Sequence, residues 1–538
     1  MQAKQFLSLA FLVFSIPRFE PAFALSRLGE TRISNGPIST SVSPAEVVPG
    51  KSVRISYQND ALLGRPTKIH LGYNGWNLNA PGFSEFFDGG NRDFYKDTTM
   101  IFDTSSGTYY VDVQVPPEAR AIHYVFCWDA CGPNQWDSNG SKDYGWPITF
   151  PYVGPFLTWN KSTDATSGVV VSFEDPFALE ANLELWSTSA STTRIFLDSS
   201  RKMHRFILNN LTPGTTYFYR VKSGSLTSPT YSFRTHDGSR NLKFIAMSDT
   251  QNGGEWCAFP FIKKEIMEKH RDVDFLLFAG DFAWNDNPGQ WWNMFDSARD
   301  LLASKVIMLA PGNHDTPTNN SNSDISSFRY YFDLPYETPR LGHYEFSAGP
   351  ATFFAMDSEN VREVGVGGVE YSWLGQKVTE RKFEIEKDPH LWTFAFWHVP
   401  PVDAARRHAG QQYAFQPAAI LASQVVDFHF SGHEHLYQRS APLDWQLGKQ
   451  TEYGVGPERG TGYVVLPSSG AWPEPGLGNS GAERVVFAGS DGAGKTAGNG
   501  FVRIDINDNA LLLRTFQTMS INSPTGIQLV DQITVQKR

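Results

Sequence analysis

Five apolar segments in the second half of the chain each run directly into a cluster of polar side chains. They are "LKFIAM", "FLLFA", "VIMLA", "WTFAF" and "VVDFHF", and the helical patterns "PFIKKEIMEKH" and "WWNMFDSARDLL" separate the first three. Buried strands that alternate with helices indicate a layered α/β domain. In such sheets, ligands collect beyond the carboxyl ends of the strands. The pattern therefore predicts the fold class of this half and the edge that carries its site.

The polar clusters offer nitrogen and oxygen atoms of the kind that bind transition metals. Two carboxylates, one carboxamide and three histidines follow the strands: Asp249, Asp281, Asn313, His398, His433 and His435. The last two stand in Gly-His-Glu-His, where a turn allows histidines one residue apart to point to the same side. Ordinary loops also place polar residues after strands. Five clusters that all carry metal-binding side chains favour a site for two metal ions.

The motifs "GD", "GNHD", "WHVP" and "GHEH" occur in the order seen in calcineurin-like metallophosphoesterases. Residues 240–520 resemble that family, and in particular the purple acid phosphatase type. The resemblance implies an αββα domain, a phosphomonoester substrate and acid phosphatase activity. Two cations about 3.5–4 Å apart would hold the phosphoryl oxygens and convert a bound water into the attacking hydroxide.

The resemblance also implies a role for each residue of these motifs. Asp281 would bridge both metals, Asn313, His398 and His433 would complete one site, and Asp249 and His435 would hold the other. His314 would act beside the phosphate as a proton donor or electrostatic clamp. His408 follows His398 by ten residues, about where the family places another histidine that contacts the substrate.

Two positions depart from the purple acid phosphatase pattern. Gln251 stands where that type has glycine and the wider superfamily often has histidine. Trp284 stands where the type has a tyrosinate ligand, three residues after Asp281. Either Gln251 or water would fill the site that lacks the phenolate. We expect a protein without purple colour, and the metals remain open among divalent or mixed-valence pairs of Fe, Zn and Mn.

The first half of the chain reads as two β-sandwiches. Residues 38–150 contain period-two strands broken by Gly, Pro and Asn. Residues 151–237 repeat the pattern on a smaller scale, and "LTPGTTY" resembles the fibronectin type III stretch whose tyrosine packs at a corner. We expect two sandwiches followed by the layered α/β domain at residues 238–538.

Two tryptophans in the first predicted sandwich suggest a binding surface. Trp76 in "HLGYNGW" and Trp136 in "WDSNGSKDY" lie among Gly and Asn, in loops that should expose them. These patterns resemble the family 25 carbohydrate-binding modules, which bind starch and related α-glucans. By that resemblance His70, Trp76 and Trp136 form a sugar platform. The alternative is that both indoles pack inside the sandwich.

The N-terminus resembles a secretory signal peptide over residues 1–24. Cys127 and Cys131 lie four residues apart and would form a disulfide in an oxidising compartment, with Cys257 left over. Glycosylation sequons occur at Asn139, Asn160, Asn210 and Asn319. The net charge of -10 argues against a nucleic-acid partner, and no later segment is apolar enough to span a membrane.

These observations predict a secreted metal-dependent phosphatase that its N-terminal module targets to α-glucan. One alternative is a carbohydrate-binding protein whose phosphatase fold no longer turns over, which Gln251 and Trp284 would favour. Another is a phosphodiesterase, which would use the same metals with a differently shaped pocket.

Overall fold

The structure is a computed structural model of the whole chain. It describes residues 31–32, 37–43, 47, 50–74, 76, 82–88, 91–117, 119–138, 143–148, 151–175, 178–188, 193–224, 226–251, 258–286, 288–317, 324–404, 408, 411–473, 484–488, 498–518 and 526–537. The predicted signal peptide, Cys257, Asn139 and Asn319 lie outside these residues.

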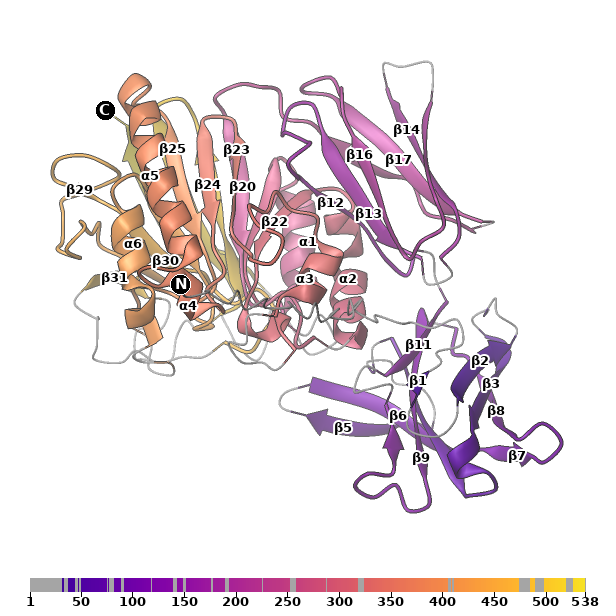
Figure 1. Cartoon of the computed structure of the whole chain (residues 1–538). Coiled ribbons are helices and arrows are strands. Elements are labelled where there is room, and N and C mark those ends of the chain that lie inside the picture. Colours follow the sequence, from indigo (N-terminus) through magenta and orange to yellow (C-terminus); the bar gives the residue numbers. More distant parts are fainter. Residues whose placement is uncertain are drawn as a thin grey trace, which may run out of the picture.

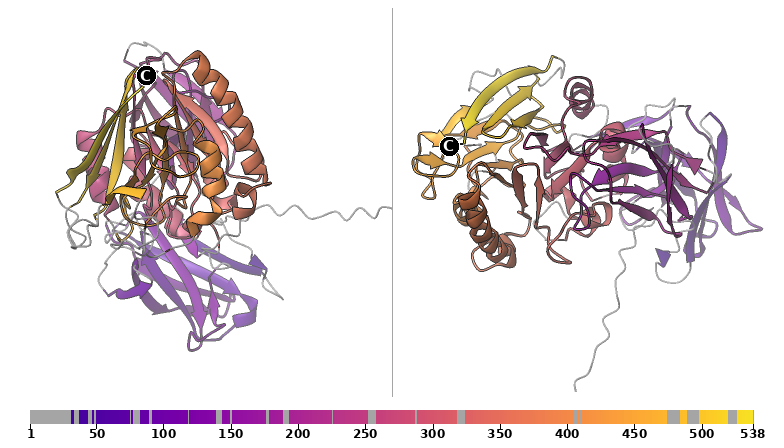
Figure 2. Two further views of the ribbon diagram at one scale, coloured as in Figure 1. Left: turned by 90° about the vertical axis from the view of Figure 1, so that its left-hand side faces the viewer. Right: turned by 90° about the horizontal axis from the view of Figure 1, so that it is seen from above.

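Residues 31–147 form two antiparallel sheets, as the alternating pattern predicts. One has the strand order β1-β2-β3-β8-β7, and the other has the order β10-β9-β4-β6-β5 with β11 beside β9. The strands are β1 (Thr31–Arg32), β2 (Pro37–Ser43), β3 (Ser52–Asn59), β4 (Thr67–Tyr73), β5 (Ser84–Asp88), β6 (Asn91–Thr99), β7 (Ile101–Asp103), β8 (Thr108–Gln114), β9 (Ala121–Trp128), β10 (Trp136–Asp137) and β11 (Tyr144–Pro147), with a 3-10 turn η1 (Asp60–Leu62) after β3. Tyr57 from the first sheet stacks on Phe126 from the second, with ring centroids 3.8 Å apart. This region lies on one side of the rest of the molecule in Figure 1 and in the left view of Figure 2.

The next strands form two facing sheets, as predicted, but one of these sheets continues beyond residues 151–237. The sheet β15-β14-β17-β18, with β19 beside β17, faces the strands β16-β13-β12, and these continue into a much larger sheet. The continuation is the parallel pairing of Leu157 in β12 with Val306 in β22. The strands are β12 (Val153–Thr158), β13 (Val169–Glu174), β14 (Ala181–Ser187), β15 (Arg194–Asp198), β16 (Met203–Leu208), β17 (Thr216–Ser223), β18 (Leu226–Thr227) and β19 (Tyr231–Arg234). The corner tyrosine is confirmed, because the backbone N–H of Thr212 donates to Tyr217 Oη at 2.8 Å.

Two sheets form the centre of the second half. The larger one has the order β16-β13-β12-β22-β21-β20-β32-β33-β34, and the other has the order β23-β24-β25-β26-β30-β27-β31. Their strands are β20 (Leu242–Met247), β21 (Phe275–Ala279), β22 (Val306–Ala310), β23 (Tyr344–Ala348), β24 (Ala351–Ala355), β25 (Trp392–Phe396), β26 (Phe428–Ser431), β27 (Gln438–Ser440), β30 (Gly462–Val465), β31 (Val485–Ala488), β32 (Gly500–Ile506), β33 (Ala510–Gln517) and β34 (Gln528–Gln536). A small pair, β28 (Glu452–Tyr453) and β29 (Arg459–Gly460), lies apart from them. Aromatic rings fill the space between the sheets, for example Phe244 against Phe353 and Phe394 at 5.2 and 5.4 Å.

Helices cover the outer faces of both sheets (Figure 1). They are α1 (Phe259–Lys269), α2 (Pro288–Leu302), α3 (Ser326–Tyr331), α4 (Val361–Val364), α5 (Val369–Lys387) and α6 (Gln416–Ala422), with 3-10 turns η2 (Asn313–Asp315) and η3 (Gln411–Ala414). Leu374 of α5 and Ala418 of α6 share a buried cluster with Phe354 of β24. The layered α/β architecture predicted from the sequence is confirmed. No helix among the described residues is both long enough and apolar enough to cross a bilayer.

The N-terminal region contacts the second half through α2. Arg120 Nη1 lies 2.8 Å from Asp296 Oδ2, and the His123 ring lies 5.4 Å from that of Trp292. Helix α2 begins seven residues after Asp281 in the sequence.

Candidate metal centre

The predicted metal ligands follow the carboxyl ends of β20, β21, β22, β25 and β26. Four of them have left-handed backbone conformations: Asp249, Asp281, His433 and His435, with φ between 47° and 73°. Residues other than glycine seldom adopt such angles, and where they do the surrounding structure must hold them. At these strand ends the backbone turns so that the side chains point to a common centre.

Three glycines next to these turns leave room for the ligands themselves. A Cβ on Gly280 would lie 2.5 Å from the His398 ring, and one on Gly312 would lie 2.2 Å from Asp281 Oδ1. A Cβ on Gly432 would lie 1.8 Å from Ser248 Oγ and 2.7 Å from Asp249 Oδ2. The glycines of "GD", "GNHD" and "GHEH" are therefore explained by the close approach of ligand side chains.

The first group of predicted ligands converges on Asn313. Its Oδ1 lies 3.1 Å from Nε2 of His398 and 3.1 Å from Nδ1 of His433. Nε2 of His398 also lies 3.2 Å from Oδ2 of Asp281. Four predicted ligand atoms from four different strand ends thus lie close together.

The second group of predicted ligands is Asp249, His435 and Gln251. Nε2 of His435 lies 3.4 Å from Oδ1 of Asp249, and one ligand atom each of Asp249, Asp281 and His398 lie within 4.8 Å of one another. Gln251 is completely buried and its Nε2 donates to Asp281 Oδ2. Oε1 of Gln251 accepts no hydrogen bond from the described residues, so a carboxamide oxygen is left for a cation.

The three histidines fit bound cations because both nitrogens of each ring face oxygen atoms. Nδ1 of His398 donates to the Ala279 carbonyl at 2.8 Å, and Nδ1 of His435 donates to the Trp472 carbonyl at 2.9 Å. A neutral imidazole has only one N–H, so the other nitrogen presents a lone pair toward the neighbouring ligand oxygen. A metal ion between this nitrogen and the oxygen would accept a lone pair from each of them. Metal-binding histidines are usually held in this way, with the outer N–H on an oxygen. The residues present therefore fit a metal pair.

The electrostatics of the site favour positive charge at the same place. Burial disfavours the charged form of His398, yet the carboxylate of Asp281 raises its pKa to about 10. Burial likewise opposes ionisation of Asp281, but His398 and His314 lower its pKa. The carboxylate of Asp281 thus attracts positive charge at His398.

Asp315, the last residue of "GNHD", organises the loop after Asp281. Its carboxylate accepts hydrogen bonds from the N–H groups of Phe282, Ala283 and Gly312 at 3.2, 2.9 and 3.0 Å. Burial and the nearby Asp281 raise the pKa of Asp315 to about 7. The motif "GNHD" alone did not indicate this structural role for Asp315.

The two predicted substrate-contacting histidines lie beside the metal ligands. Nδ1 of His314 donates to the Trp284 carbonyl at 2.6 Å, and Nε2 lies 4.0 Å from Asp281 Oδ2. The ring of His408 stacks on that of His433 at 4.1 Å, and its Nδ1 lies 3.3 Å from Oε1 of the buried Glu434. Their catalytic roles stay predictions.

The predicted sugar platform needs one correction. Trp136 is 40% exposed, but Trp76 is only 9% exposed. Trp76 packs against Gly72, where a Cβ would lie 2.3 Å from the indole, and its Nε1 donates to Asp143 at 3.1 Å. His70 lies between the two indoles, 5.4 Å from Trp76 and 5.6 Å from Trp136.

Two other expectations from the N-terminal half have clear outcomes. Cys127 and Cys131 form the predicted disulfide. The sequon at Asn160 is not a surface site, because Asn160 is buried and its Nδ2 donates to Asp333 at 2.7 Å. Asn210 is exposed.

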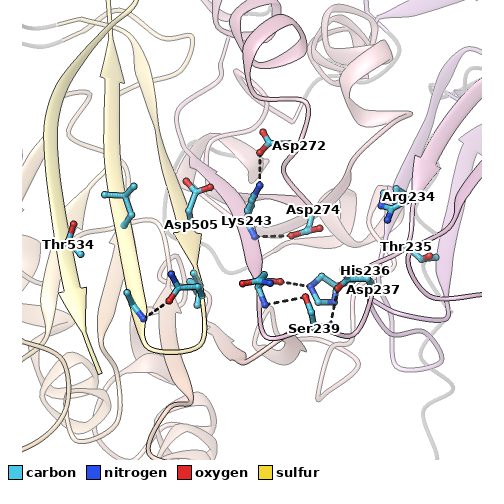
Figure 3. A pocket seen from close by; sticks show the side chains of 15 residues that line it. Arg234, Thr235, His236, Asp237, Ser239, Lys243, Asp272, Asp274, Asp505 and Thr534 are labelled. Atoms are coloured by element: carbon cyan, nitrogen blue, oxygen red, sulfur yellow. Dashed lines mark hydrogen bonds and ion pairs between the residues drawn. The ribbon is translucent and has the colours of Figure 1, made fainter. Parts of the chain in front are cut away.

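A cavity of about 680 Å³ lies away from the predicted ligands (Figure 3). Asn241 and Lys243 at the beginning of β20 line it, whereas Asp249 follows the other end of that strand. Lys243 Nζ contacts Asp272 at 2.9 Å, and its backbone N–H donates to Asp274 at 2.8 Å. Lys243 is therefore already paired with two carboxylates at this cavity.

Two families of known proteins match parts of this chain. Residues 242–437 match the calcineurin-like phosphoesterase family, and residues 156–235 match the N-terminal domain of purple acid phosphatases. The chain is 26% identical to purple acid phosphatase 21 of Arabidopsis thaliana over 266 residues, which are 47% of this chain and 57% of that protein. It is 24% identical to acid phosphatase type 7 of Homo sapiens over 343 residues, 58% of this chain and 74% of that protein.

Among solved structures, the fold resembles that of the purple acid phosphatase PPD1 from yellow lupin seeds. The TM-score is 0.63 at 15% identity, and the alignment covers 92% of this chain and 95% of that one. The structure of PhoD gives a TM-score of 0.53 at 12% identity and covers 73% and 92% of the two chains.

Proposed function

We propose that this acid phosphatase-like metallophosphoesterase hydrolyses phosphomonoesters at the centre built on Asp281. The observation that carries the proposal is the set of histidines with oxygen atoms at both ring nitrogens, grouped around a buried carboxylate. Asp281 would help to hold both ions. Asn313, His398 and His433 would hold one ion, and Asp249, His435 and Gln251 would hold the other.

When bound, two cations would neutralise the phosphoryl oxygens and supply an activated water. The residues of the chain then have separate tasks. The water oxygen would bond to phosphorus, with loss of one water proton to solvent, while the phosphorus–oxygen bond to the alcohol breaks. His314 would give its Nε2 proton to the departing alkoxide. The hydrogen bond from its Nδ1–H to the Trp284 carbonyl fixes the orientation of the ring. His408 would contact a phosphoryl oxygen.

The test combines metal analysis with turnover. Purified protein should contain two transition-metal ions per chain and hydrolyse p-nitrophenyl phosphate, and His314→Gln should lower kcat by about 100-fold or more without loss of metal. A protein with two ions that hydrolyses neither p-nitrophenyl phosphate nor its bis-ester would be a degenerate phosphatase. Faster hydrolysis of the bis-ester would identify a phosphodiesterase.

A second function, binding of α-glucan by the N-terminal region, is favoured by the surroundings of Trp136. The exposed indole is nearly perpendicular to the ring of His70, and His70 stacks on Tyr95 at 4.0 Å. Nδ1 of His70 lies 2.7 Å from Asp97. An exposed aromatic face beside polar groups suits the C–H face and the hydroxyls of a pyranose. Trp76 is largely buried and contacts the ring of His70, so its part is packing.

Retention on insoluble starch tests this second function. The full chain should be retained, and Trp136→Ala should reduce the retained fraction. Trp445→Ala is the matched control, because Trp445 is 61% exposed and lies far along the chain from the platform. Failure of the wild-type chain to bind starch would end the carbohydrate interpretation and leave the phosphatase proposal intact.

Secretion is part of the proposal as well. It rests on the signal-like residues 1–24 and on the Cys127–Cys131 disulfide, which suits an oxidising compartment. N-terminal sequencing of the protein from culture medium should begin near Leu25, and recovery of uncleaved protein from the cytoplasm would contradict it.

A further inference from the structure

The three histidines of the candidate metal centre are not held in the same way. His398 and His435 each donate their outer N–H to a backbone carbonyl, that of Ala279 or Trp472. Nδ1 of His433 faces Oδ1 of Asn313. Its Nε2 contacts a side-chain oxygen, Oε1 of Gln411, at 2.9 Å. One ligand therefore depends on a side chain that substitution can remove.

The chemistry of this contact fixes the orientation and tautomer of His433. The Oε1 atom of Gln411 is an acceptor only, so Nε2 of His433 must carry the proton. Nδ1 then has a free lone pair directed at Asn313 Oδ1, the side on which the ion would bind. Loss of Gln411 would let the ring rotate and exchange tautomers.

The backbone around Gln411 holds it against His433. Gln411 opens the turn η3, and its N–H donates to the His408 carbonyl at 3.1 Å. The ring of His408 in turn stacks on His433. The same short segment thus contacts one ligand ring on its face and at its outer nitrogen.

We infer that Gln411 is a positioning residue for the metal ion that His433, Asn313 and His398 would hold. The inference rests on the proposed function, because it takes His433 as a ligand. Outer partners of metal-binding histidines commonly change affinity by 10- to 100-fold. Gln411 is exposed, so water partly replaces it, and we expect the lower end of that range.

Zinc affinity measured by chelator competition on the full chain provides the test. Gln411→Leu should weaken one of the two zinc sites by about tenfold and leave the other unchanged. Gln411→Glu keeps an acceptor at the same place and should restore wild-type affinity or tighten it. With cobalt(II) in place of zinc, the visible spectrum of Gln411→Leu should change, and that of Gln411→Glu should match the wild type.

Gln416→Leu is the matched control, since it makes the same chemical change five residues along the chain at the start of α6. It should leave both affinities unchanged. Equal zinc affinities and cobalt spectra in wild type and Gln411→Leu would overturn the inference. If Gln411→Leu does not fold, Gln411→Asn, which shortens the side chain, takes its place with the same expected loss. Absence of two zinc sites in the wild type would instead refute the proposed function.

Discussion

The indole of Trp284 lies against the imidazole of His314, with ring centroids 4.9 Å apart and planes inclined by 34°. The Trp284 carbonyl also accepts the Nδ1 proton of the same histidine at 2.6 Å. Trp284 therefore supports His314 through both its ring and its carbonyl. Its ring offers no lone pair to a metal.

This relationship predicts the effect of changing Trp284. Trp284→Ala removes the ring beside His314 but keeps the carbonyl, so the imidazole should tilt and kcat should fall by about tenfold. Trp284→Phe keeps a flat ring and should retain most activity. Steady-state kinetics with p-nitrophenyl phosphate separate the two, and equal loss in both variants would contradict the packing argument.

The same position predicts the optical spectrum. Iron-loaded wild-type protein should show no strong band at roughly 500–600 nm, the region typical of tyrosinate–iron(III) charge transfer. Activity after chelation should return with divalent ions, because carboxylate, carboxamide and histidine ligands suit them. A strong band in the wild type would mean that another tyrosine reaches the iron.

Asn313 should be a neutral oxygen ligand, because its Oδ1 lies 3.1 Å from both His398 and His433. Asn313→Ala should lower metal affinity at one site by at least about tenfold and reduce turnover. Asn313→Asp keeps the oxygen and should retain two ions. Metal analysis and thermal unfolding would check both, and full metal content with full activity in Asn313→Ala would refute this assignment.

Gly432→Ala should disrupt the site through sterics alone. The new Cβ would meet Ser248 Oγ at 1.8 Å and Asp249 Oδ2 at 2.7 Å. Overpacking of this kind costs about 1–3 kcal/mol, and displacement of Asp249 should empty one metal site. Gly375→Ala in α5 is the control, because its Cβ would meet only Leu421 at an ordinary 3.7 Å. Unchanged metal content in Gly432→Ala would contradict the close approach.

The ends of the strands were predictable, because each motif directly follows an apolar segment whose composition indicates a buried strand. The reason for the glycines of "GD" and "GHEH" was not predicted, because the side chains that crowd Gly280 and Gly432 come from distant segments. Helix α5 was not predicted, although buried Leu374 and Val378 lie four residues apart.

What could not be predicted depends on contacts between distant segments. The pairing of Leu157 with Val306 joins two regions that local periodicity treats as separate. The burial of Trp76 results from its position over Gly72 and beside His123, which its Gly- and Asn-rich neighbours do not indicate. Gln411 lies 22 residues from His433, and no pattern in the chain marks it as the partner of a ligand.

The last prediction concerns stability and a carboxyl group outside the metal site. Glu174, in β13, is fully buried, and Tyr330 of α3 donates to its Oε1 at 3.1 Å. Its Oε2 accepts no hydrogen bond from the described residues. Burial raises the pKa of Glu174 from its ordinary value of 4.5 to about 7. The folded protein therefore favours the neutral acid.

The sign of the pH dependence follows from this shift. Below pH 4.5 both the folded and the unfolded chain hold the proton, and between 4.5 and about 7 only the folded chain keeps it. The stability contributed by the neutral group is thus lost as pH rises through that window.

Glu174→Gln mimics the neutral acid at every pH. Relative to wild type, its free energy of unfolding should increase by on the order of 2–3 kcal/mol between about pH 4 and pH 8. Denaturant titrations at several pH values measure this difference, with the 58% exposed Glu268, changed to Gln, as the control. A difference for Glu174→Gln that stays constant with pH would show that the carboxyl is ionised in the folded protein.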